Sequence, residues 1–344
     1  MIRVAVVGLG GISGEHFQKL ERIEGVRVAG ICDLSETLVR AVGDRFGVGP
    51  GFTDYEDMLE RVEPDAVHVL TPPQSHSELV LSALEAQADV LVEKPISTTL
   101  AEYEAMRDAA VERERMLVEN YNYRFVASVL RALDLVRSGS IGEVVTVDVT
   151  MSVGLTAPIY MDAELPHFAH SLPGGALRNF ASHPASLLVA MLGPHREVSV
   201  MRRREHERSQ SDDELRALVE LEGGVATLTL TSHSQPPWFG MTVRATRGTI
   251  EIDIPDRRLH VDRAGSPVYR LANPVRHGMG YLTSTTALLA RSLTASQDYF
   301  EGFERLLNEF YRAMQRQSGP PVSIEEMDGV NRLVEALFAD GATR

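Results

Sequence analysis

The most constraining feature of the sequence is a short apolar run that ends in a cluster of glycines. Residues 2–7 read IRVAVV, which is typical of a strand that is buried on both faces, as in a parallel sheet. The run leads directly into GLGGISG at residues 8–14, and a helical stretch follows as far as about Arg22. Strand, tight turn and helix in this order predict the first half of a βαβ unit.

The glycines are spaced as in a turn that approaches a phosphate. Gly8, Gly10 and Ser13 match G-x-G-x-x-G/A with serine at the last position. The first glycine would allow the tight turn, the second would admit a pyrophosphate, and the serine is small enough for helix and strand to pack. A phosphate there would lie at a helix N-terminus, where free N–H groups favour anions. A purely structural turn is the alternative. The residues predicted to surround a dinucleotide pyrophosphate are Gly8, Gly10, Gly11, Ile12 and Ser13.

An acid stands where such a turn needs one. Asp33 ends the second apolar run, residues 26–32, and follows Gly14 by 19 residues. This is close to the ~20 residues expected for an acid that binds the adenosine ribose hydroxyls. A carboxylate at this position would repel a 2′-phosphate, so the pattern favours NAD over NADP.

The alternation of strands and helices continues through the first 120 residues. Further apolar runs occupy residues 66–70, 89–93 and 115–119. Three helices between these runs are predicted to begin with a capping box, a hydroxyl residue followed three positions later by glutamate, at Thr53, Ser75 and Thr99. The pattern predicts an α/β fold with a doubly wound parallel sheet.

The second half of the chain has a different pattern. Short strands are predicted near residues 144–149, 215–221, 225–231, 241–245, 249–254 and 259–261, joined by glycine-containing turns. Such connections favour a mostly antiparallel sheet. Helices are predicted at about 291–317 and 323–339, the second with a capping box at Ser323. We therefore expect a Rossmann domain over residues 1–122 and a second α/β domain over 123–344, whose C-terminal helix could pack back on the first.

Composition excludes several classes of partner and site. The net charge of −14 disfavours nucleic acid and anionic membranes, and Arg202–Arg204 are interpreted as a solvated hairpin end because acids flank them. Cys32 is the only cysteine, so neither an intrachain disulfide nor a Cys-based metal site is expected. The sequence lacks a secretory apolar region and any apolar run near the ~20 residues of a membrane span. We expect a cytoplasmic protein.

The fourth apolar run ends on a charged pair. Residues 90–97 read VLVEKPIS, so Glu93 and Lys94 follow the strand directly and Pro95 ends it. Charges often mark the point where a strand leaves the core, and proline often stops a strand. However, ligands of open α/β sheets bind at the carboxyl ends of strands. A placement for chemistry is therefore the second interpretation.

Several motifs in order resemble one enzyme family. The segments VAVVGLGGISGEHF, VHVLTPPQSH, VLVEKPIS, ENYNYRF, SGSIGEV and GGALRNFASHPASLLVAMLG are similar to those of the Gfo/Idh/MocA oxidoreductases. The resemblance implies a Rossmann domain, a C-terminal domain with a large open sheet, and hydride transfer between NAD(P) and a sugar, cyclitol or related polyol. It also implies a homodimer or homotetramer.

The resemblance further assigns roles to residues near the cofactor. It places Lys94 beside the nicotinamide and the reacting hydroxyl, where an ammonium can steady an alkoxide and donate a proton. Pro95 is expected to follow a cis peptide bond. The residues that it adds to the cofactor site are Thr71, Pro72, His76, Glu93 and Asn122, and for His76 a role in the first turn of its own helix is the alternative.

The helix near Gly174 departs from the family pattern G-G-x-L-x-D-x-G-x-H-x-x-D. His183 is kept and is expected to act as a general acid or base opposite Lys94. Asn179 and Ser186 stand where the two aspartates usually are, and an amide cannot act as a base. The catalytic residues are thus predicted to be Lys94 and His183. The predicted substrate site consists of Lys94, Arg124, Tyr160, Asn179 and His183.

Three hypotheses follow from these features. The first is an NAD-dependent dehydrogenase or reductase acting on a sugar-like alcohol or ketone. The second is a non-catalytic nucleotide-binding regulator, suggested by the changes at Asn179 and Ser186. The third is a glycosidase-type or lyase-type member that uses bound NAD transiently. No metal is expected, because His167 and His170 have no third ligand at a telling spacing.

Overall fold

The computed structural model describes residues 1–154, 167–205, 209, 211–232, 234–264 and 301–339, with isolated positions between 275 and 286. The chain divides into two compact units. The first comprises residues 1–121 and 303–331, and the second comprises residues 122–302 and 332–344. The sequence prediction assigned residues 303–331 to the second domain, whereas the structure groups them with the first unit. The domain limits 1–122 and 123–344 stay a prediction.

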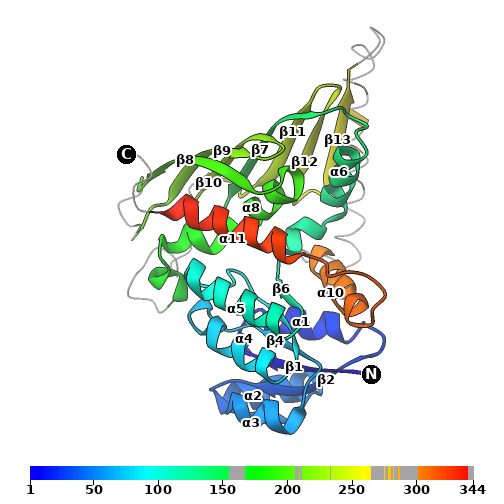
Figure 1. Ribbon diagram of the computed structural model, residues 1–344, viewed down its shortest axis with the longest axis vertical. Helices are drawn as coiled ribbons and strands as arrows, with labels where there is room; N and C mark the ends of the chain where they lie inside the picture. The colour runs from blue at the N-terminus through cyan, green and yellow to red at the C-terminus, as the bar shows by residue number, and fades with distance from the viewer. Residues whose placement is uncertain are drawn as a thin grey trace. The chain divides into compact units, whose positions relative to one another are not determined.

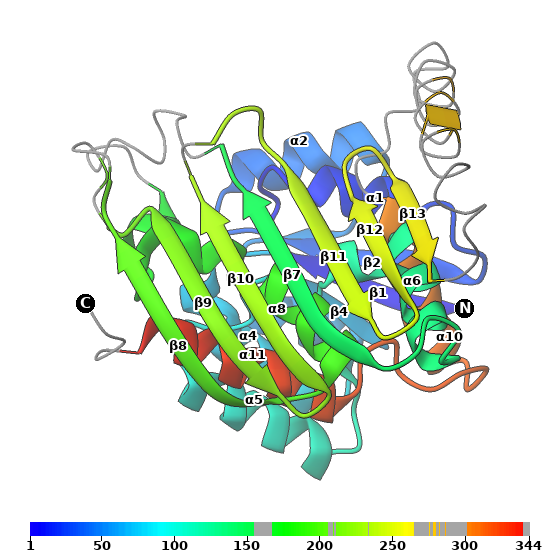
Figure 2. The ribbon, with the colours of Figure 1, turned by 90° about the horizontal axis from the view of Figure 1, so that it is seen from above.

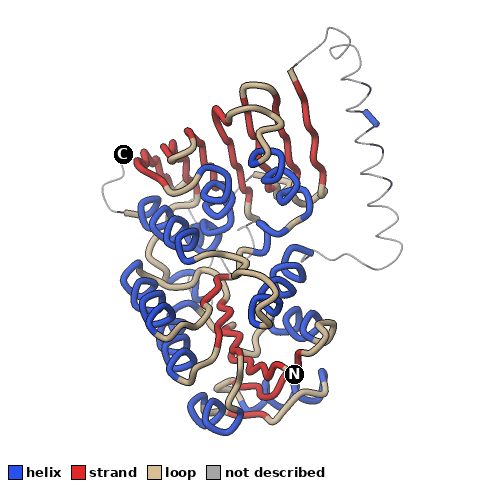
Figure 3. The backbone as a smooth tube through the Cα atoms, turned by 45° about the vertical axis from the view of Figure 1, so that its right-hand side comes forward, coloured by secondary structure: helices blue, strands red, loops and turns tan. Residues whose placement is uncertain are grey.

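The first unit contains the predicted parallel sheet (Figure 1). Its strand order is β3-β2-β1-β4-β5-β6, and every neighbouring pair is parallel. The alternation of strands and helices can be followed in Figure 3. The elements are β1 Ile2–Val7, α1 Ser13–Leu20, β2 Val26–Cys32, α2 Glu36–Phe46, β3 Gly51–Phe52, α3 Tyr55–Val62, β4 Ala66–Val69, η1 Pro73–Ser75, α4 His76–Glu85, β5 Asp89–Val92, α5 Leu100–Glu112 and β6 Leu117–Glu119, together with most of α10 Glu301–Met314 and the first half of α11 Ile324–Phe338.

The carboxyl ends of five strands, β1, β2, β4, β5 and β6, meet at one edge of this sheet. The backbone N–H of Glu93 bonds to the carbonyl of Val69, and that of Asn120 bonds to the carbonyl of Val92, so the ladder continues past the ends of β5 and β6. Gly8 likewise donates to Cys32 of β2. Because parallel strands share their direction, the glycine turn, Asp33 and the charged pair after β5 all lie at the same carboxyl edge.

Two of the four predicted capping boxes are confirmed. Thr99 accepts the Glu102 N–H at the start of α5, and Ser323 and Glu326 exchange the same pair of bonds before α11. The prediction for α3 was wrong, because Asp54 caps the helix by accepting the Asp57 N–H at 2.9 Å. The prediction for α4 was also wrong, since the Ser75 hydroxyl donates to Thr71 Oγ1 at 2.8 Å instead. In both places a nearer polar partner replaces the box.

The second unit contains the predicted, mostly antiparallel sheet (Figure 2). Its order is β13-β12-β11-β7-β10-β9-β8, and only β7 and β10 run parallel among these strands. The helix α8 packs on β7 and β10. The elements are η2 Asn122–Phe125, α6 Ala127–Arg137, β7 Val144–Ser152, η3 Phe168–Ser171, η4 Gly175–Leu177, α8 Arg178–Leu192, β8 His195–Arg203, β9 Glu214–Leu221, β10 Gly224–Thr231, β11 Phe239–Ala245, β12 Gly248–Asp253 and β13 Arg258–Arg263.

The sequence prediction missed β8, but the arginines that it interpreted as a hairpin end do lie at the end of this strand, which pairs antiparallel with β9. Arg202 lies within β8, and its guanidinium donates to the carbonyl of Phe338 at 3.0 Å. Arg203 and Arg204 are exposed, as a solvated strand end requires. The strand was missed because polar residues interrupt its apolar positions. No helix of the described residues is long and apolar enough to cross a membrane.

Candidate functional site

The glycine turn after β1 is shaped by backbone crowding on one side and open space on the other. Gly8 has φ +90°, and a Cβ there would lie 2.7 Å from the Thr71 nitrogen, so only glycine fits. A Cβ on Gly10 or Gly11 would meet nothing within 4 Å. Ser13 closes the turn by donating its hydroxyl to the Gly10 carbonyl at 2.7 Å. The space above the middle glycines is where a backbone-bound anion could approach.

The start of α1 is suited to such an anion. Ile12 occupies the N-cap position and its side chain makes no capping hydrogen bond. The first N–H groups of a helix have no intrahelical partner, and the helix dipole favours negative charge there. The turn and the helix start thus supply donors without a competing side-chain cap.

Asp33 is fixed to the glycine turn. One carboxylate oxygen accepts the Leu9 N–H at 2.8 Å, and the other accepts the Ser35 N–H at 2.8 Å. Each oxygen keeps a further lone pair, so the carboxylate can still accept hydrogen bonds from ribose hydroxyls. Leu34 follows it with a side chain that is 95% exposed. An exposed leucine beside an acid that is predicted to bind ribose is a surface on which a flat base could pack, and sequence reasoning missed it.

Glu93 is a buried carboxylate surrounded by donors. It accepts from Asn120 Nδ2 at 2.6 Å, from His16 Nε2 at 3.2 Å and from the Lys94 N–H at 3.3 Å. Burial by itself would raise the pKa of Glu93. The hydrogen bonds from His16 and the Asn120 amide and the charge of Lys94 act against burial, and the pKa of Glu93 is lowered to about 2. Glu93 is therefore a permanent negative charge beside Lys94.

Lys94 is held at the strand end by the turn that follows it. The peptide bond between Lys94 and Pro95 is cis, as expected from the sequence. The side chain is half-buried, and burial lowers the pKa of Lys94, whereas the charges of Glu93 and Glu119 raise it. An amine shifted toward neutrality can exchange a proton more readily than a solvent-exposed lysine.

Glu119, at the end of β6, is a second buried carboxyl near Lys94 that sequence reasoning missed. It accepts from the Tyr121 hydroxyl at 2.7 Å and from Asn331 Nδ2 at 3.2 Å. Burial raises the pKa of Glu119 to about 7, against the lowering effect of these bonds and of Lys94. The only available signal was an acid at the end of a predicted strand.

His76 spans the ends of β4 and β5. Its Nε2 lies 2.7 Å from the carbonyl oxygen of Thr71, and its Nδ1 lies 3.1 Å from that of Pro95 and 3.2 Å from that of Ile96. The ring is fully buried, and burial lowers its pKa despite these carbonyls. Both ring nitrogens face the protein itself, so His76 holds the turn after Lys94 in place. A direct contact between His76 and a cofactor stays a prediction, as do contacts by Thr71 and the exposed Pro72.

The second unit brings together most of the other predicted residues. His183 and Asn179 lie on α8, Asn122 and Arg124 lie on η2, and all four are buried where these two elements pack. The Tyr123 ring contacts the His183 ring edge-on, with 4.7 Å between centroids. These polar side chains lie among the mostly apolar buried residues of α8. A few polar groups in apolar surroundings are typical of a functional site.

Ser186, which stands where the family usually has its second aspartate, has a local role. It donates its hydroxyl to the His183 carbonyl at 2.8 Å, so it is used within its own helix. Tyr160 lies outside the described residues. Because Lys94 belongs to the first unit and His183 to the second, their predicted opposition stays a prediction.

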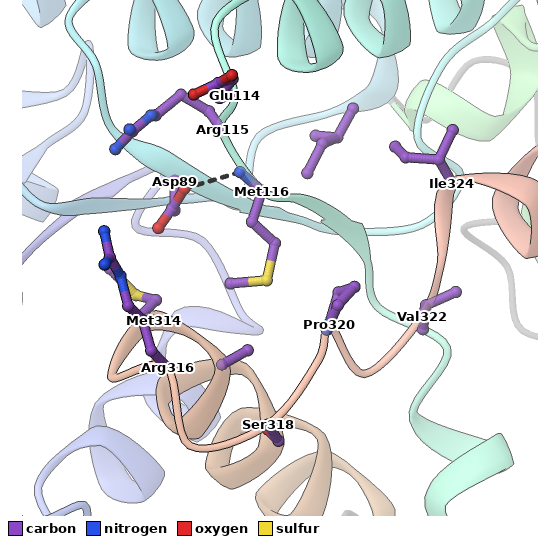
Figure 4. A pocket seen from close by; sticks show the side chains of 12 residues that line it. Asp89, Glu114, Arg115, Met116, Met314, Arg316, Ser318, Pro320, Val322 and Ile324 are labelled. Atoms are coloured by element: carbon purple, nitrogen blue, oxygen red, sulfur yellow. Dashed lines mark hydrogen bonds between the residues drawn. The ribbon is translucent and has the colours of Figure 1, made fainter.

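A pocket of about 420 Å³ lies in the first unit, away from this edge (Figure 4). Asp89 and Leu117, at the first residues of β5 and β6, line it together with the segment that joins α10 to α11. The Asp89 carboxylate accepts the Met116 N–H there at 2.7 Å. None of the predicted site residues lines this pocket, so it is not the cofactor site.

Comparison with known proteins matches both halves of the chain to one family. The model described as "Oxidoreductase family, NAD-binding Rossmann fold" matches residues 2–121, and the model of the GFO/IDH/MocA C-terminal domain matches residues 129–251. Together they cover more than two thirds of the chain.

Individual relatives match over shorter stretches. A myo-inositol 2-dehydrogenase of Thermotoga maritima is 30% identical over 142 residues, which are 41% of this chain and 42% of that protein. Glycosyl hydrolase family 109 protein 2 of Akkermansia muciniphila is 33% identical over 153 residues, which are 41% of this chain and 32% of that protein. The matched part thus spans less than half of either relative.

Solved structures share the whole fold. The WlbA dehydrogenase of Bordetella pertussis, solved in complex with NADH and UDP-GlcNAcA, superposes with a TM-score of 0.80 at 21% identity. The superposition covers 98% of this chain and 94% of that one.

Proposed function

Because the chain belongs to the Gfo/Idh/MocA oxidoreductase family, we propose that it is an NAD-dependent dehydrogenase whose substrate is a sugar, cyclitol or related polyol. The proposal joins the carboxyl edge of the first unit with the chemistry of Lys94. Relatives with sugar-like or cyclitol substrates in their names, such as the myo-inositol 2-dehydrogenase, support the substrate class.

The residues at the carboxyl edge fit a dinucleotide. The open space above Gly10 and Gly11 and the uncapped start of α1 suit a pyrophosphate. The Asp33 carboxylate would bind the adenosine ribose, and Leu34 would cover one face of the adenine. A carboxylate fixed by two backbone N–H groups cannot move away from a 2′-phosphate, which supports NAD over NADP.

Lys94 would handle the substrate proton. When bound, the nicotinamide ring supplies the hydride acceptor or donor. Oxidation of an alcohol also releases the hydroxyl proton, and reduction of a ketone consumes one. An ammonium beside the reacting oxygen stabilises the developing alkoxide and donates a proton, and the neutral amine takes the proton back. Glu93 keeps this amine charged, and Glu119 can take up a proton near neutral pH.

The polar cluster of the second unit would recognise the substrate. Arg124 and Asn179 can hydrogen-bond sugar hydroxyls, and His183 is a second candidate for acid/base chemistry. The neutral Asn179 supplies no negative charge where the family usually has aspartate. The proton chemistry of this member would therefore rest more on Lys94 and His183.

The observation that carries the proposal is Lys94, fixed by a cis-proline turn at the same sheet edge as the glycine turn and Asp33. The test is to incubate the protein with NAD and separate panels of cyclitols, aldoses, glycosides and nucleotide sugars, following NADH by its absorbance. NADH should accumulate with one of these classes. No NADH with any class, despite NADH binding, would contradict a dehydrogenase.

A second candidate is a glycosidase that uses bound NAD transiently. It is favoured by the 33% identity to glycosyl hydrolase family 109 protein 2 over 153 residues. Such an enzyme would cleave a glycoside with catalytic amounts of NAD and leave no net NADH. Product analysis of the glycoside panel, carried out alongside the absorbance measurement, distinguishes the two candidates.

A further inference from the structure

A continuous chain of polar side chains runs through the core of the first unit and ends on Glu93. The Tyr311 hydroxyl lies 2.7 Å from His68 Nε2, the two Nδ1 atoms of His68 and His16 lie 2.9 Å apart, and His16 Nε2 lies 3.2 Å from Glu93 Oε1. All four residues are buried. They come from α10, β4, α1 and the end of β5.

The chemistry of these groups allows one arrangement of protons when Glu93 is ionised and both imidazoles are neutral. A carboxylate only accepts hydrogen bonds, so His16 carries its proton on Nε2 and has a lone pair on Nδ1. His68 must then carry its proton on Nδ1 and accept at Nε2. Tyr311 completes the chain as the donor to that nitrogen. Every donor therefore points toward Glu93.

With both imidazoles neutral, the fully reversed arrangement requires a protonated Glu93, whereas a protonated His16 would donate to both neighbours and make His68 the donor to Tyr311. In the fully reversed arrangement the carboxyl would donate to His16 Nε2, His16 Nδ1 would donate to His68, and His68 Nε2 would donate to the Tyr311 oxygen. Tyr311 is the donor to His68 in the first arrangement and the acceptor from His68 in the second. Burial keeps the hydroxyl protonated, because it raises the pKa of Tyr311 and lowers that of His68.

The chain is not a route for protons to leave the protein. The Tyr311 side chain is almost fully buried, and its ring packs against those of Phe310 and His68. A proton moved along the chain would therefore end at an enclosed hydroxyl. A chain that is closed at one end and bonded to a carboxylate at the other is suited to orientation rather than conduction.

Burying polar side chains at these positions costs free energy of folding unless each one is hydrogen-bonded. His68 stands between Val67 and Val69 in β4, a strand whose four residues are all buried. A branched apolar residue would pack there without a hydrogen-bond requirement. Three buried polar groups in a row require that each be satisfied, and only a defined set of tautomers does this.

We propose that His16, His68 and Tyr311 are positioning residues that hold Glu93 ionised and oriented beside Lys94. The proposal rests on the proposed function in one point, namely that Lys94 is the catalytic amine. The groups that face Glu93 are His16 from α1, Asn120 from the end of β6, and Lys94 next to it; Glu119 faces Lys94. Loss of the chain would leave Glu93 with fewer hydrogen-bond donors, and the pKa of Glu93 would rise.

The first test needs no substrate. The ring nitrogens of the whole protein, labelled with ¹⁵N-histidine, are observed by NMR at neutral pH and assigned by the variants His16→Gln and His68→Val. His68 is expected with its proton on Nδ1 and His16 with its proton on Nε2. A His68 protonated on Nε2 would overturn the proposal, because Tyr311 would then be the acceptor.

The second test measures Glu93 itself in ¹³C-glutamate-labelled protein. Tyr311→Phe removes only the hydroxyl and should raise the midpoint of the Glu93 carboxyl titration, with about a tenfold change in its proton affinity. Tyr103→Phe is the matched control, since Tyr103 is equally buried in the same unit but outside the chain. An unchanged Glu93 midpoint in Tyr311→Phe, or an equal shift in the control, would overturn the proposal.

The third test connects the chain to turnover. With a substrate from the panel, Tyr311→Phe should move the acid limb of the kcat profile toward higher pH and leave NADH binding unchanged. Failure of the proposed function would remove this readout but leave both NMR results standing. An NMR result against the chain, with dehydrogenase activity present, would overturn only the positioning role.

Discussion

Two glutamates stand at the ends of neighbouring strands of the first unit, and the groups that donate hydrogen bonds to them differ. Glu93 follows β5 and Glu119 ends β6, and both side chains are buried near Lys94. Glu93 receives hydrogen bonds from His16, Asn120 and a backbone amide, and its pKa is about 2. Glu119 receives side-chain hydrogen bonds from a tyrosine and an asparagine, and its pKa is about 7.

The comparison shows that hydrogen-bond donors and nearby charges, rather than burial alone, determine whether a buried carboxyl is ionised at neutral pH. Burial raises the pKa of both groups, and only at Glu93 do the donors outweigh it. Pairs of titratable groups whose environments push their pKa values apart are typical of acid/base sites. Lys94 is influenced by both carboxyls, of which Glu93 has a pKa of about 2 and Glu119 a pKa of about 7.

The largest expected effect on stability follows replacement of Glu93. Its pKa is lowered on folding from 4.5 to about 2, so it stabilises the native state above pH 4.5 and loses this contribution as the pH falls toward 2. Glu93→Gln should lower the free energy of unfolding at pH 7 by about 3 kcal/mol. Urea denaturation at pH 7 measures it, and a loss below about 0.5 kcal/mol would mean that the donors do not favour the charge.

A smaller effect of opposite sign is expected at Glu119. Its pKa is raised on folding from 4.5 to about 7, so its contribution is complete below pH 4.5 and is lost as the pH rises through 7. Glu119→Gln should therefore increase stability at pH 8 by about 2 kcal/mol relative to its effect at pH 5. The effect of Glu93→Gln should stay constant between pH 5 and pH 8, because Glu93 is ionised in both states there. Urea denaturation of both variants at the two pH values checks this, and an effect of Glu119→Gln that does not change with pH would break the comparison.

The smallest effect concerns the other side of the carboxyl edge. Asp33→Asn removes the negative charge and keeps an oxygen acceptor for only one of the two backbone N–H groups, those of Leu9 and Ser35. We expect about a tenfold loss in NADH affinity, and a gain in NADPH affinity because the repulsion of the 2′-phosphate is removed. Fluorescence titrations with both cofactors check this. Leu34→Ser is the companion variant, which should weaken both cofactors equally if Leu34 covers the adenine.

Much of the fold was predictable because its signals are local. Short apolar runs marked β1, β2, β4, β5 and β6, and the turn at Gly8 required a positive φ. The caps at Thr53 and Ser75 failed because a neighbouring aspartate or threonine competed for the same bonds. Local sequence cannot show which of two nearby polar groups wins.

The site was only partly predictable because its groups meet through space. Lys94 and Asp33 stand at strand ends, which a sequence can indicate. The chain from Tyr311 to Glu93 joins residues from four elements, and no spacing in the sequence connects them. Glu119 carries no motif of its own, and its importance follows from burial and from the lysine beside it.

The most direct test of the central claim is the turnover of Lys94→Ala, compared with wild type on the substrate that the panel identifies. Removal of the amine should lower kcat by about 10²- to 10⁴-fold, while the NADH affinity, measured on the same preparation, stays within about twofold. Turnover equal to that of the wild type would remove Lys94 from the chemistry, and with it any catalytic role for the two glutamates beside it.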